Sequence, residues 1–243
     1  MKIIVLTKTE YKEKDIIINA INENELISFK VRGAQVSTSP FYWLNTPLTI
    51  ADVEFIDNPR YQSKILKNAK LIYTPVSSGD SYSNYLAINF INEAINKGLD
   101  DNEKHRMFSE IENFFLENKG NEDLILSEVV FLIKLASIAG FGLNADGCIK
   151  CGSSSDIVAF SFLEGGFLCR KHFEEDMVVD FSGKDLKLIH YLTNVKHYSS
   201  LINDHANERV NKETKRSLLA KFAAFIDETL GAHINSVDLI LKI

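Results

Sequence analysis

The chain has 243 residues, 45% apolar and 25% charged, with a net charge of −6. This length and apolar content suffice to bury one large or two modest cores, so we expect folding without covalent crosslinks. The first ten residues lack the apolar core of a secretory signal, and no segment approaches the roughly 20 apolar residues of a membrane span, which predicts a soluble cytoplasmic protein. The acidic charge lacks the basic signature of many nucleic-acid binders.

The first 73 residues have the pattern of a small β-domain. Their apolar residues come in short runs or alternate with polar ones, and Gly, Pro or Asn breaks separate the runs, which is typical of strands. Five such strands suit a barrel of the oligonucleotide-binding (OB) type. The sequence therefore predicts an α+β protein with an N-terminal five-stranded OB-fold barrel in residues 1–79. The predicted strands are residues 2–6, 15–21, 25–31, 47–56 and 64–73.

Beyond a Pro, Ser and Gly cluster at residues 74–81, the apolar period becomes helical. The segment 122–142 is apolar nearly all round, which predicts the buried centre of a bundle, and its interior Glu128 and Lys134 argue against a membrane span. Residues 80–243 are therefore expected to form an α-helical domain. The predicted helices are residues 83–98, 103–120, 122–142, 183–195 and 211–231.

All three cysteines lie in one short segment that closes on a histidine. Cys148 and Cys151 form a CxxC pair, and Cys169 and His172 form a CxxH pair with the same gap. Zinc prefers a tetrahedral shell of thiolate and imidazole, and a predicted hairpin between the pairs would bring them together. Because four protein ligands leave no open position, we predict one structural Zn²⁺ in a zinc-finger module inserted at about residues 145–175.

Other interpretations of the cysteines are weaker. One alternative is that three buried cysteines and a surface histidine fall into this spacing by chance. Another is that the CxxC pair is a thioredoxin-like redox motif, but no βαβ pattern surrounds it. An odd count with two cysteines only two residues apart disfavours a disulfide framework. Metal-bound or reduced thiols both indicate a reducing compartment.

The order of a small barrel, a helical region, the Cys/His segment and further helices resembles the bacterial RecO family of recombination mediators. The match is most specific at residues 140–152, GFGLNADGCIKCG, and at Gly165, Gly166 and Cys169, which fit the family's GGxxC half-site. Zinc-bearing members commonly have cysteine where this chain has His172, which is an equally normal zinc ligand. Weaker similarity covers residues 11–15, 30–39, 47–55 and the last predicted helix with its close, residues 218–236.

The resemblance implies a non-enzymatic DNA repair protein. Such proteins bind single- and double-stranded DNA, anneal complementary strands, engage the C-terminal tail of the single-stranded-DNA-binding protein, and work with RecR to load RecA. A nucleoid-associated, cytoplasmic location follows from this role. No nucleotide-binding loop, nucleophile elbow or HExxH motif is present, which agrees with a protein that is not an enzyme.

A barrel that tracks DNA needs cations for the phosphates and flat side chains for the bases. Residues 1–80 carry 10 Lys and Arg against 9 Asp and Glu, whereas residues 81–243 carry 17 against 24, so repulsion would confine DNA to the barrel. Tyr42 and Trp43 are candidate stackers, although they equally suit a barrel plug or an interdomain contact, and Phe29 is expected in the core. The candidate DNA-binding cations are Lys8, Lys12, Lys14, Lys30, Arg32, Lys64, Lys67 and Lys70, with Lys30 and Arg32 favoured because they share one side of a strand.

A second basic cluster lies on or near the last predicted helix, where spacings of three and four place its members on one face. Arg209, Lys212 and Arg216, with Lys215 and Lys221, suit an acidic, apolar-ended tail such as that of the single-strand binder, or form a solvated face balancing nearby glutamates. A competing function is a zinc-containing protein-interaction scaffold in which the β-barrel is merely structural.

Overall fold

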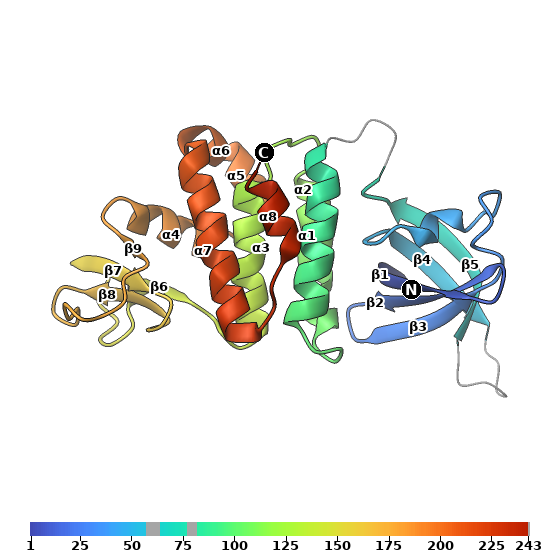
Figure 1. Ribbon diagram of the computed structural model, residues 1–243, viewed down its shortest axis with the longest axis horizontal. Helices are drawn as coiled ribbons and strands as arrows, with labels where there is room; N and C mark the ends of the chain where they lie inside the picture. The colour runs from blue at the N-terminus through green and yellow to red at the C-terminus, as the bar shows by residue number, and fades with distance from the viewer. Residues whose placement is uncertain (57–63, 77–81, 243) are drawn as a thin grey trace. The chain divides into compact units, whose positions relative to one another are not determined.

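The structure is a computed structural model that describes residues 1–56, 64–76 and 82–242 (Figure 1). The chain divides into two compact units, Met1–Leu116 and Glu117–Ile243. The first unit contains a β-barrel and two helices, and the second combines helices with a small sheet. The predicted domain boundary between residues 79 and 80 lies outside the described residues and stays a prediction.

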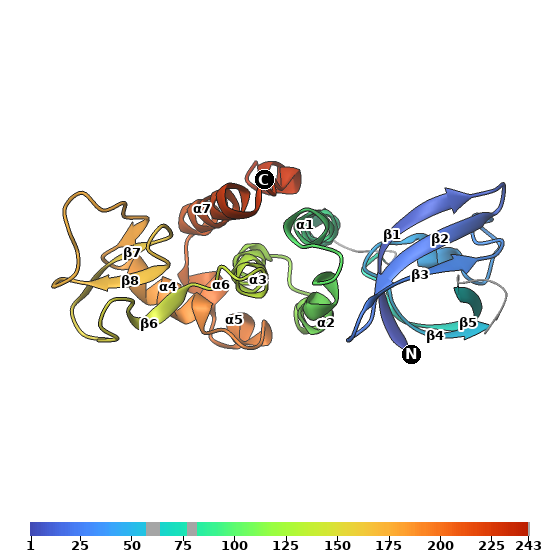
Figure 2. The same cartoon turned by 90° about the horizontal axis from the view of Figure 1, so that it is seen from below.

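Five strands close into a barrel in the order β1-β2-β3-β5-β4, which confirms the predicted barrel (Figure 2). Strand β3 pairs in parallel with β5, and β4 returns to pair with β1, so the chain crosses over before it closes, as in the Greek-key arrangement of OB barrels. The strands are β1 (Lys2–Tyr11), β2 (Asp15–Ile21), β3 (Leu26–Val31), β4 (Ile50–Ile56) and β5 (Lys64–Tyr73).

Alternation along the strands builds the barrel core. In β3, Ile27, Phe29 and Val31 are buried, whereas Ser28 between them is exposed, as a period of two requires. Phe29 packs edge-on against Phe55 at 5.0 Å between ring centroids, which confirms its predicted place in the core. Strand β1 extends beyond the predicted residues 2–6 because its pairing with β2 continues to the hairpin turn.

Two helices complete the first unit. Helix α1 (Tyr82–Gly98) corresponds to the predicted helix 83–98 and buries one apolar stripe of Leu86, Phe90, Ile91 and Ala94. The predicted helix 103–120 is divided into a 3-10 turn, η2 (Lys104–Met107), and helix α2 (Phe108–Glu117). Within this unit, Lys2 Nζ lies 2.6 Å from Glu112 Oε1, and the rings of Tyr73 and Phe115 lie 6.0 Å apart, so α2 contacts the barrel through both charge and aromatic packing.

The second unit is built on α3 (Ile125–Ile138), in which every residue from position 126 to position 133 is buried. Helix α7 (Lys212–Leu230) packs beside it (Figures 1 and 2). The buried-centre prediction for this segment is therefore confirmed. No helix within the described residues combines the length and apolar character that crossing a membrane requires.

The remaining elements of this unit form a four-stranded sheet, in the order β6-β8-β7-β9, and short helices. Two of the helices, α4 and α7, were predicted, and α5, α6 and α8 were not, since they span only four to six residues each. The strands of the sheet and the remaining helices are β6 (Asn144–Cys148), β7 (Ile157–Ser161), β8 (Gly166–Cys169), β9 (Phe181–Ser182), α4 (Asp185–Thr193), α5 (Ser199–Asn203), α6 (Ala206–Arg209) and α8 (Asn235–Ile240).

Candidate metal centre and nucleic-acid interface

The predicted hairpin between the two ligand pairs is present. Strands β7 and β8 pair antiparallel and β6 pairs in parallel with β8, so Cys148 at the end of β6 and Cys169 at the end of β8 lie at the same edge of the sheet. Gly166 is required for this close pairing, because a Cβ atom there would lie 2.0 Å from the carbonyl oxygen of Asn144. The sheet therefore positions one ligand from each pair.

Tight turns position the other two ligands. The N–H groups of Cys151 and Gly152 donate to the carbonyl oxygen of Cys148, at 3.3 and 2.7 Å, and Gly152 has the positive φ of 73° that favours glycine. In the second turn, the N–H groups of His172 and Phe173 donate to the carbonyl oxygen of Cys169, at 2.9 and 3.0 Å. The matching turns direct two side chains from each pair toward one point.

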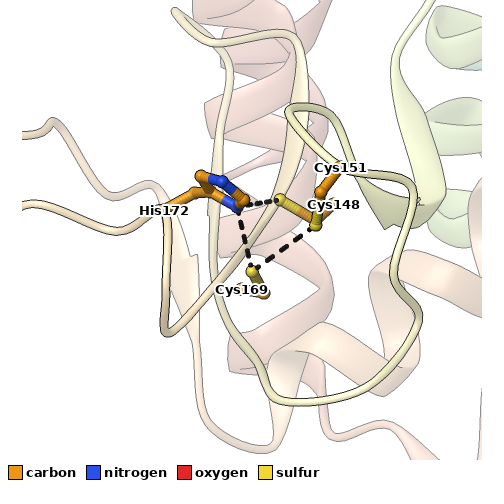
Figure 3. Close-up of side chains that lie close together, drawn as sticks. All are labelled: Cys148, Cys151, Cys169 and His172. Carbon is orange, nitrogen blue, oxygen red and sulfur yellow. Dashed lines mark hydrogen bonds between the residues drawn. The ribbon is translucent and has the colours of Figure 1, made fainter.

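The four side chains meet with the spacing of a tetrahedral metal site (Figure 3). Nδ1 of His172 lies 3.6 Å from Sγ of Cys148 and 3.3 Å from Sγ of Cys169, and the sulfurs of Cys151 and Cys169 are 3.9 Å apart. All four ligand atoms lie within 4.8 Å of one another. Zinc–ligand bonds of about 2.0–2.3 Å give tetrahedral edges of roughly 3.5–3.8 Å, so the four residues can hold one ion.

The surroundings of Cys148 favour its thiolate form. Burial of the Cys148 side chain opposes ionisation, but the backbone N–H groups of Cys169, Lys150 and Cys151 face its sulfur and lower its pKa to about 6. Cys148 and Cys169 are buried, His172 is half-buried and Cys151 is exposed. A four-ligand site with a soft N/S donor set and no open position is suited to holding structure.

On the barrel, hydrogen bonds bring the β1–β2 turn together with the segment that follows β3. Gln35 donates from its backbone N–H to the carbonyl oxygen of Lys14, at 3.1 Å, and from its side-chain amide to the carbonyl oxygen of Lys12, at 3.3 Å. Lys12, Lys14 and Arg32 are all exposed. Three predicted DNA-binding cations from two separate segments are thereby placed on joined loops.

A fourth cation is connected to the same segment. Lys8 Nζ donates to Asn45 Oδ1 at 3.1 Å, and the Asn45 amide donates to the carbonyl oxygens of Ala34 and Tyr42, at 2.7 Å each. Among the described residues, no carboxylate forms a salt bridge with Lys8, Lys12, Lys14 or Arg32. These four cations are called the turn surface below.

The two candidate stacking residues differ in availability. Tyr42, in the 3-10 turn η1 (Tyr42–Asn45), is 48% exposed. Trp43 packs against the barrel core, and its indole N–H donates to the carbonyl oxygen of Pro40 at 2.7 Å. Tyr42 therefore offers a face for a base, whereas Trp43 acts in part as the barrel plug that the sequence left as an alternative.

The two favoured cations, Lys30 and Arg32, differ in their availability for DNA. Lys30 Nζ lies 2.6 Å from Asp15 Oδ2 and 4.7 Å from the centre of the Tyr11 ring, and its side chain is mostly buried. Arg32 follows the end of β3 and is exposed. Lys30 therefore has a structural partner on the neighbouring strand, and only Arg32 offers an exposed charge.

The candidate cations on β5 lie beside acidic groups. Lys64 pairs with Glu25 at 3.4 Å and Lys67 pairs with Glu54 at 3.6 Å, while Lys70 lies opposite Asp52 in the β4–β5 register. Acidic neighbours reduce the attraction of these lysines for phosphate. The sequence did not reveal this neutralisation, because the glutamates lie 13 to 39 positions away and only the strand pairing brings them close.

The basic cluster near the last long helix is not one exposed face. Lys215 is only 3% exposed, and its ammonium pairs with Asp123 at the start of the second unit. Arg209 ends α6 and is exposed, Lys212 begins α7 and is exposed, and Arg216 is half-buried. The three predicted partner-binding residues thus lie near an ion pair between a buried lysine and a partly exposed aspartate, which the helical spacing alone did not indicate.

Comparisons with known proteins agree with the architecture. A family model described as the C-terminal part of recombination protein O matches residues 79–238. The chain is similar to the DNA repair protein RecO of Bacillus cytotoxicus, with 25% identity over 96% of this chain and 92% of the relative. It is also similar to the proteins of the same name from Bacillus cereus strain AH187 and from Bacillus anthracis, with 24% identity over the same shares.

Proposed function

Because this chain belongs to the RecO family of DNA repair proteins, we propose that it is a non-enzymatic recombination mediator that binds single- and double-stranded DNA and anneals complementary strands. The observation that carries the proposal is the family match over residues 79–238, joined to a closed five-stranded barrel at the amino terminus. The protein acts in the cytoplasm, in association with the nucleoid.

The turn surface is the best-supported place for DNA on the barrel. Its cations, Lys8, Lys12, Lys14 and Arg32, have no salt-bridge partner among the described residues, and each neutralised phosphate releases condensed counterions. Tyr42 lies on the same connected segment and has an exposed ring for stacking on an unpaired base. Loops at one end of an OB barrel commonly bind oligonucleotides, so this placement agrees with the fold.

The partners follow from the same role. The protein binds a RecR-like protein and the C-terminal tail of the single-stranded-DNA-binding protein, and thereby helps to load RecA onto coated DNA. Arg209, Lys212 and Arg216 are the proposed contacts for that acidic tail, since their positive charges complement the carboxylates of an acidic peptide.

The metal centre has a structural role in this proposal. The chemistry that the four residues favour is one Zn²⁺, which when bound ties β6, β8 and the turn after β8 into one module. Cys148, Cys151 and Cys169 supply thiolates, and His172 supplies Nδ1. None of these side chains acts on a substrate.

Strand annealing tests the function directly. Two complementary oligonucleotides, one carrying a donor dye and the other an acceptor, are mixed with the protein without any nucleotide triphosphate. A mediator accelerates the appearance of energy transfer, with affinity for the single strand that falls steeply with salt. Full metal loading together with no DNA binding at low salt would instead support the interaction scaffold.

A further inference from the structure

The four candidate metal ligands differ in their access to solvent. Cys148 and Cys169 are 1% and 5% exposed and His172 is half-buried, whereas Cys151 is exposed. The backbone N–H groups of Lys150, Cys151 and Cys169 also face the Cys148 sulfur and screen it from solution. Cys151 is therefore the ligand that a small molecule in solution reaches first.

The backbone that follows Cys151 leaves this access open. Gly152 comes next with a φ of 73°, and a Cβ atom at this position would have no atom within 4 Å apart from its chain neighbours. The three residues after it are serines, of which Ser154 and Ser155 are exposed. A segment of one glycine and three serines has no side chain large enough to cover the sulfur.

A second thiol lies close to Cys151. Its Sγ atom is 3.9 Å from the Sγ atom of Cys169, which belongs to the other ligand pair and ends β8. A disulfide bond is about 2.05 Å long, so the two sulfurs have to approach by roughly 2 Å to form one. Cys151 lies in the turn after β6, and not in a strand, so its side chain can supply this movement. The bond would join the same two segments that the metal joins.

We propose that Cys151 is a site of oxidation by peroxides, and that its oxidation to a disulfide with Cys169 releases the zinc ion. The reactivity of a cysteine toward peroxide increases with its thiolate character and with its exposure. Zinc holds its cysteine ligands as thiolates, so Cys151 has both properties, whereas buried Cys148 and Cys169 have only the first. The inference rests on the metal centre and is independent of DNA binding.

The oxidation takes two steps with hydrogen peroxide as the oxidant. The Cys151 sulfur attacks one oxygen atom, the O–O bond breaks, and the products are the sulfenic acid of Cys151 and hydroxide. The Cys169 thiolate then attacks the Cys151 sulfur, the S–O bond breaks, and a second hydroxide leaves as the disulfide forms. The two sulfurs lose two electrons, the peroxide gains them, and both hydroxides take up protons from solution.

The loss of two thiolates leaves Cys148 and His172 as the remaining protein ligands. Structural zinc sites in proteins use four, so the ion is released. Each protein molecule reacts once, which makes the reaction a modification of the protein and not catalysis. The disulfide is reversible by thiols, so the site can be restored when the oxidant is gone.

Zinc release and peptide mapping test the proposal on the full-length, zinc-loaded protein. After addition of hydrogen peroxide, a chromogenic chelator measures the released zinc, and we expect about one equivalent per chain. Free thiols are then alkylated in denaturant, and the protein is digested with trypsin. Trypsin cuts after Lys150 and Arg170, so Cys151 and Cys169 lie in one peptide and Cys148 lies in another.

Mass spectrometry distinguishes the possible disulfides. The expected product is peptide 151–170 without alkylation and lighter by two hydrogens. A crosslink between this peptide and the one that contains Cys148 would overturn the pairing, and zinc retained in peroxide would overturn the inference as a whole. Dithiothreitol with added zinc should restore the metal content, and failure to do so would contradict a reversible disulfide. A protein without zinc before peroxide is added would overturn the metal centre, and this inference with it, but not the proposed DNA binding.

Two variants that keep four metal ligands separate the exposed thiol from the rest of the site. Cys151→His should retain zinc and release it at least about tenfold more slowly in peroxide, because the remaining thiolates are buried. His172→Cys keeps Cys151 and should release zinc at least as fast as the wild type. Equal rates in the Cys151→His variant and the wild type would show that peroxide reaches a buried sulfur and that Cys151 is not the site. If Cys151→His does not bind zinc, the peptide map of the wild type decides.

Discussion

Lys30 on β3 and Asp15 on β2 form an ion pair of 2.6 Å on the outer face of the barrel, next to the ring of Tyr11. The hydrogen bond from Lys30 has the largest effect in lowering the pKa of Asp15, and the hydrogen bond from the N–H of Gly33 adds to it. The pair joins neighbouring strands and the turn after β3, so its main effect is on the barrel's stability.

This pair predicts a dependence of barrel stability on acid. Because the Asp15 pKa is lowered in the folded state, its contribution is complete above the ordinary value of 3.8 and is lost as the pH falls through the lower folded value. Lys30→Ala should cost about 1 kcal/mol of unfolding free energy at pH 7, measured by urea denaturation. The variant should lose less of its stability than the wild type on acidification below pH 4, and an equal loss would contradict the assignment.

The turn surface predicts which charge reversals weaken DNA binding. Replacing Lys12, Lys14 and Arg32 together with Glu should reduce affinity for a labelled single strand at least tenfold at low salt and flatten the plot of log affinity against log salt. The matched control replaces Lys64, Lys67 and Lys70 with Glu. Lys64 and Lys67 form salt bridges with glutamates, and Lys70 lies opposite Asp52 on the paired strand. The control should change the salt slope less. A larger effect from the β5 variant would move the DNA site to that strand.

The metal centre predicts one equivalent of zinc per chain, measured by elemental analysis. Cys169→Ser removes a buried ligand and should lower zinc content and destabilise the sheet of the second unit. His172→Cys keeps four ligands and should retain the metal, since thiolate and imidazole both suit zinc. The His172→Cys variant is the control for local packing: loss of metal from it as well would show that the ring's geometry is needed in addition to its donor atom.

The buried carboxyl of Glu128 in α3 predicts a second pH effect. Burial and, to a lesser extent, the charge of Asp123 raise its pKa from 4.5 to about 8, and its Oε2 atom has no hydrogen-bond partner among the residues that the structure describes. A raised folded pKa means that the contribution to stability is complete below 4.5 and is lost as the pH rises from there through 8. Glu128→Gln should therefore gain up to about 4 kcal/mol relative to the wild type between pH 5 and pH 9. Glu122→Gln, at an exposed position, should show no such change.

The ion pair between buried Lys215 and partly exposed Asp123 predicts that Lys215 affects folding and not partner binding. Lys215→Ala leaves a carboxylate without its partner and should lower the unfolding free energy by about 2 kcal/mol, measured by denaturation. Lys212→Ala, three residues earlier and exposed, should leave stability within about 0.5 kcal/mol of the wild type. Similar losses in both variants would mean that the first turn of α7 is fixed by helix formation alone.

Local patterns in the sequence determined the elements and the candidate metal ligands. The period of two in residues 1–73, the helical stripe of α1 and the all-round apolar α3 each require only neighbours in sequence, because strand and helix periods are local. The two candidate ligand pairs could also be predicted from the sequence, because a gap of two residues in a tight turn directs both side chains toward one ion.

Only the tertiary structure decided which charges are available. Lys30 and Lys215 are indistinguishable from solvated lysines in the sequence, yet Asp15 and Asp123 pair with them from distant positions. The sequence likewise does not distinguish exposed Cys151 from buried Cys148 and Cys169. Ion pairing and exposure depend on which segments pack together, and that packing is a property of the whole fold, which no local period encodes.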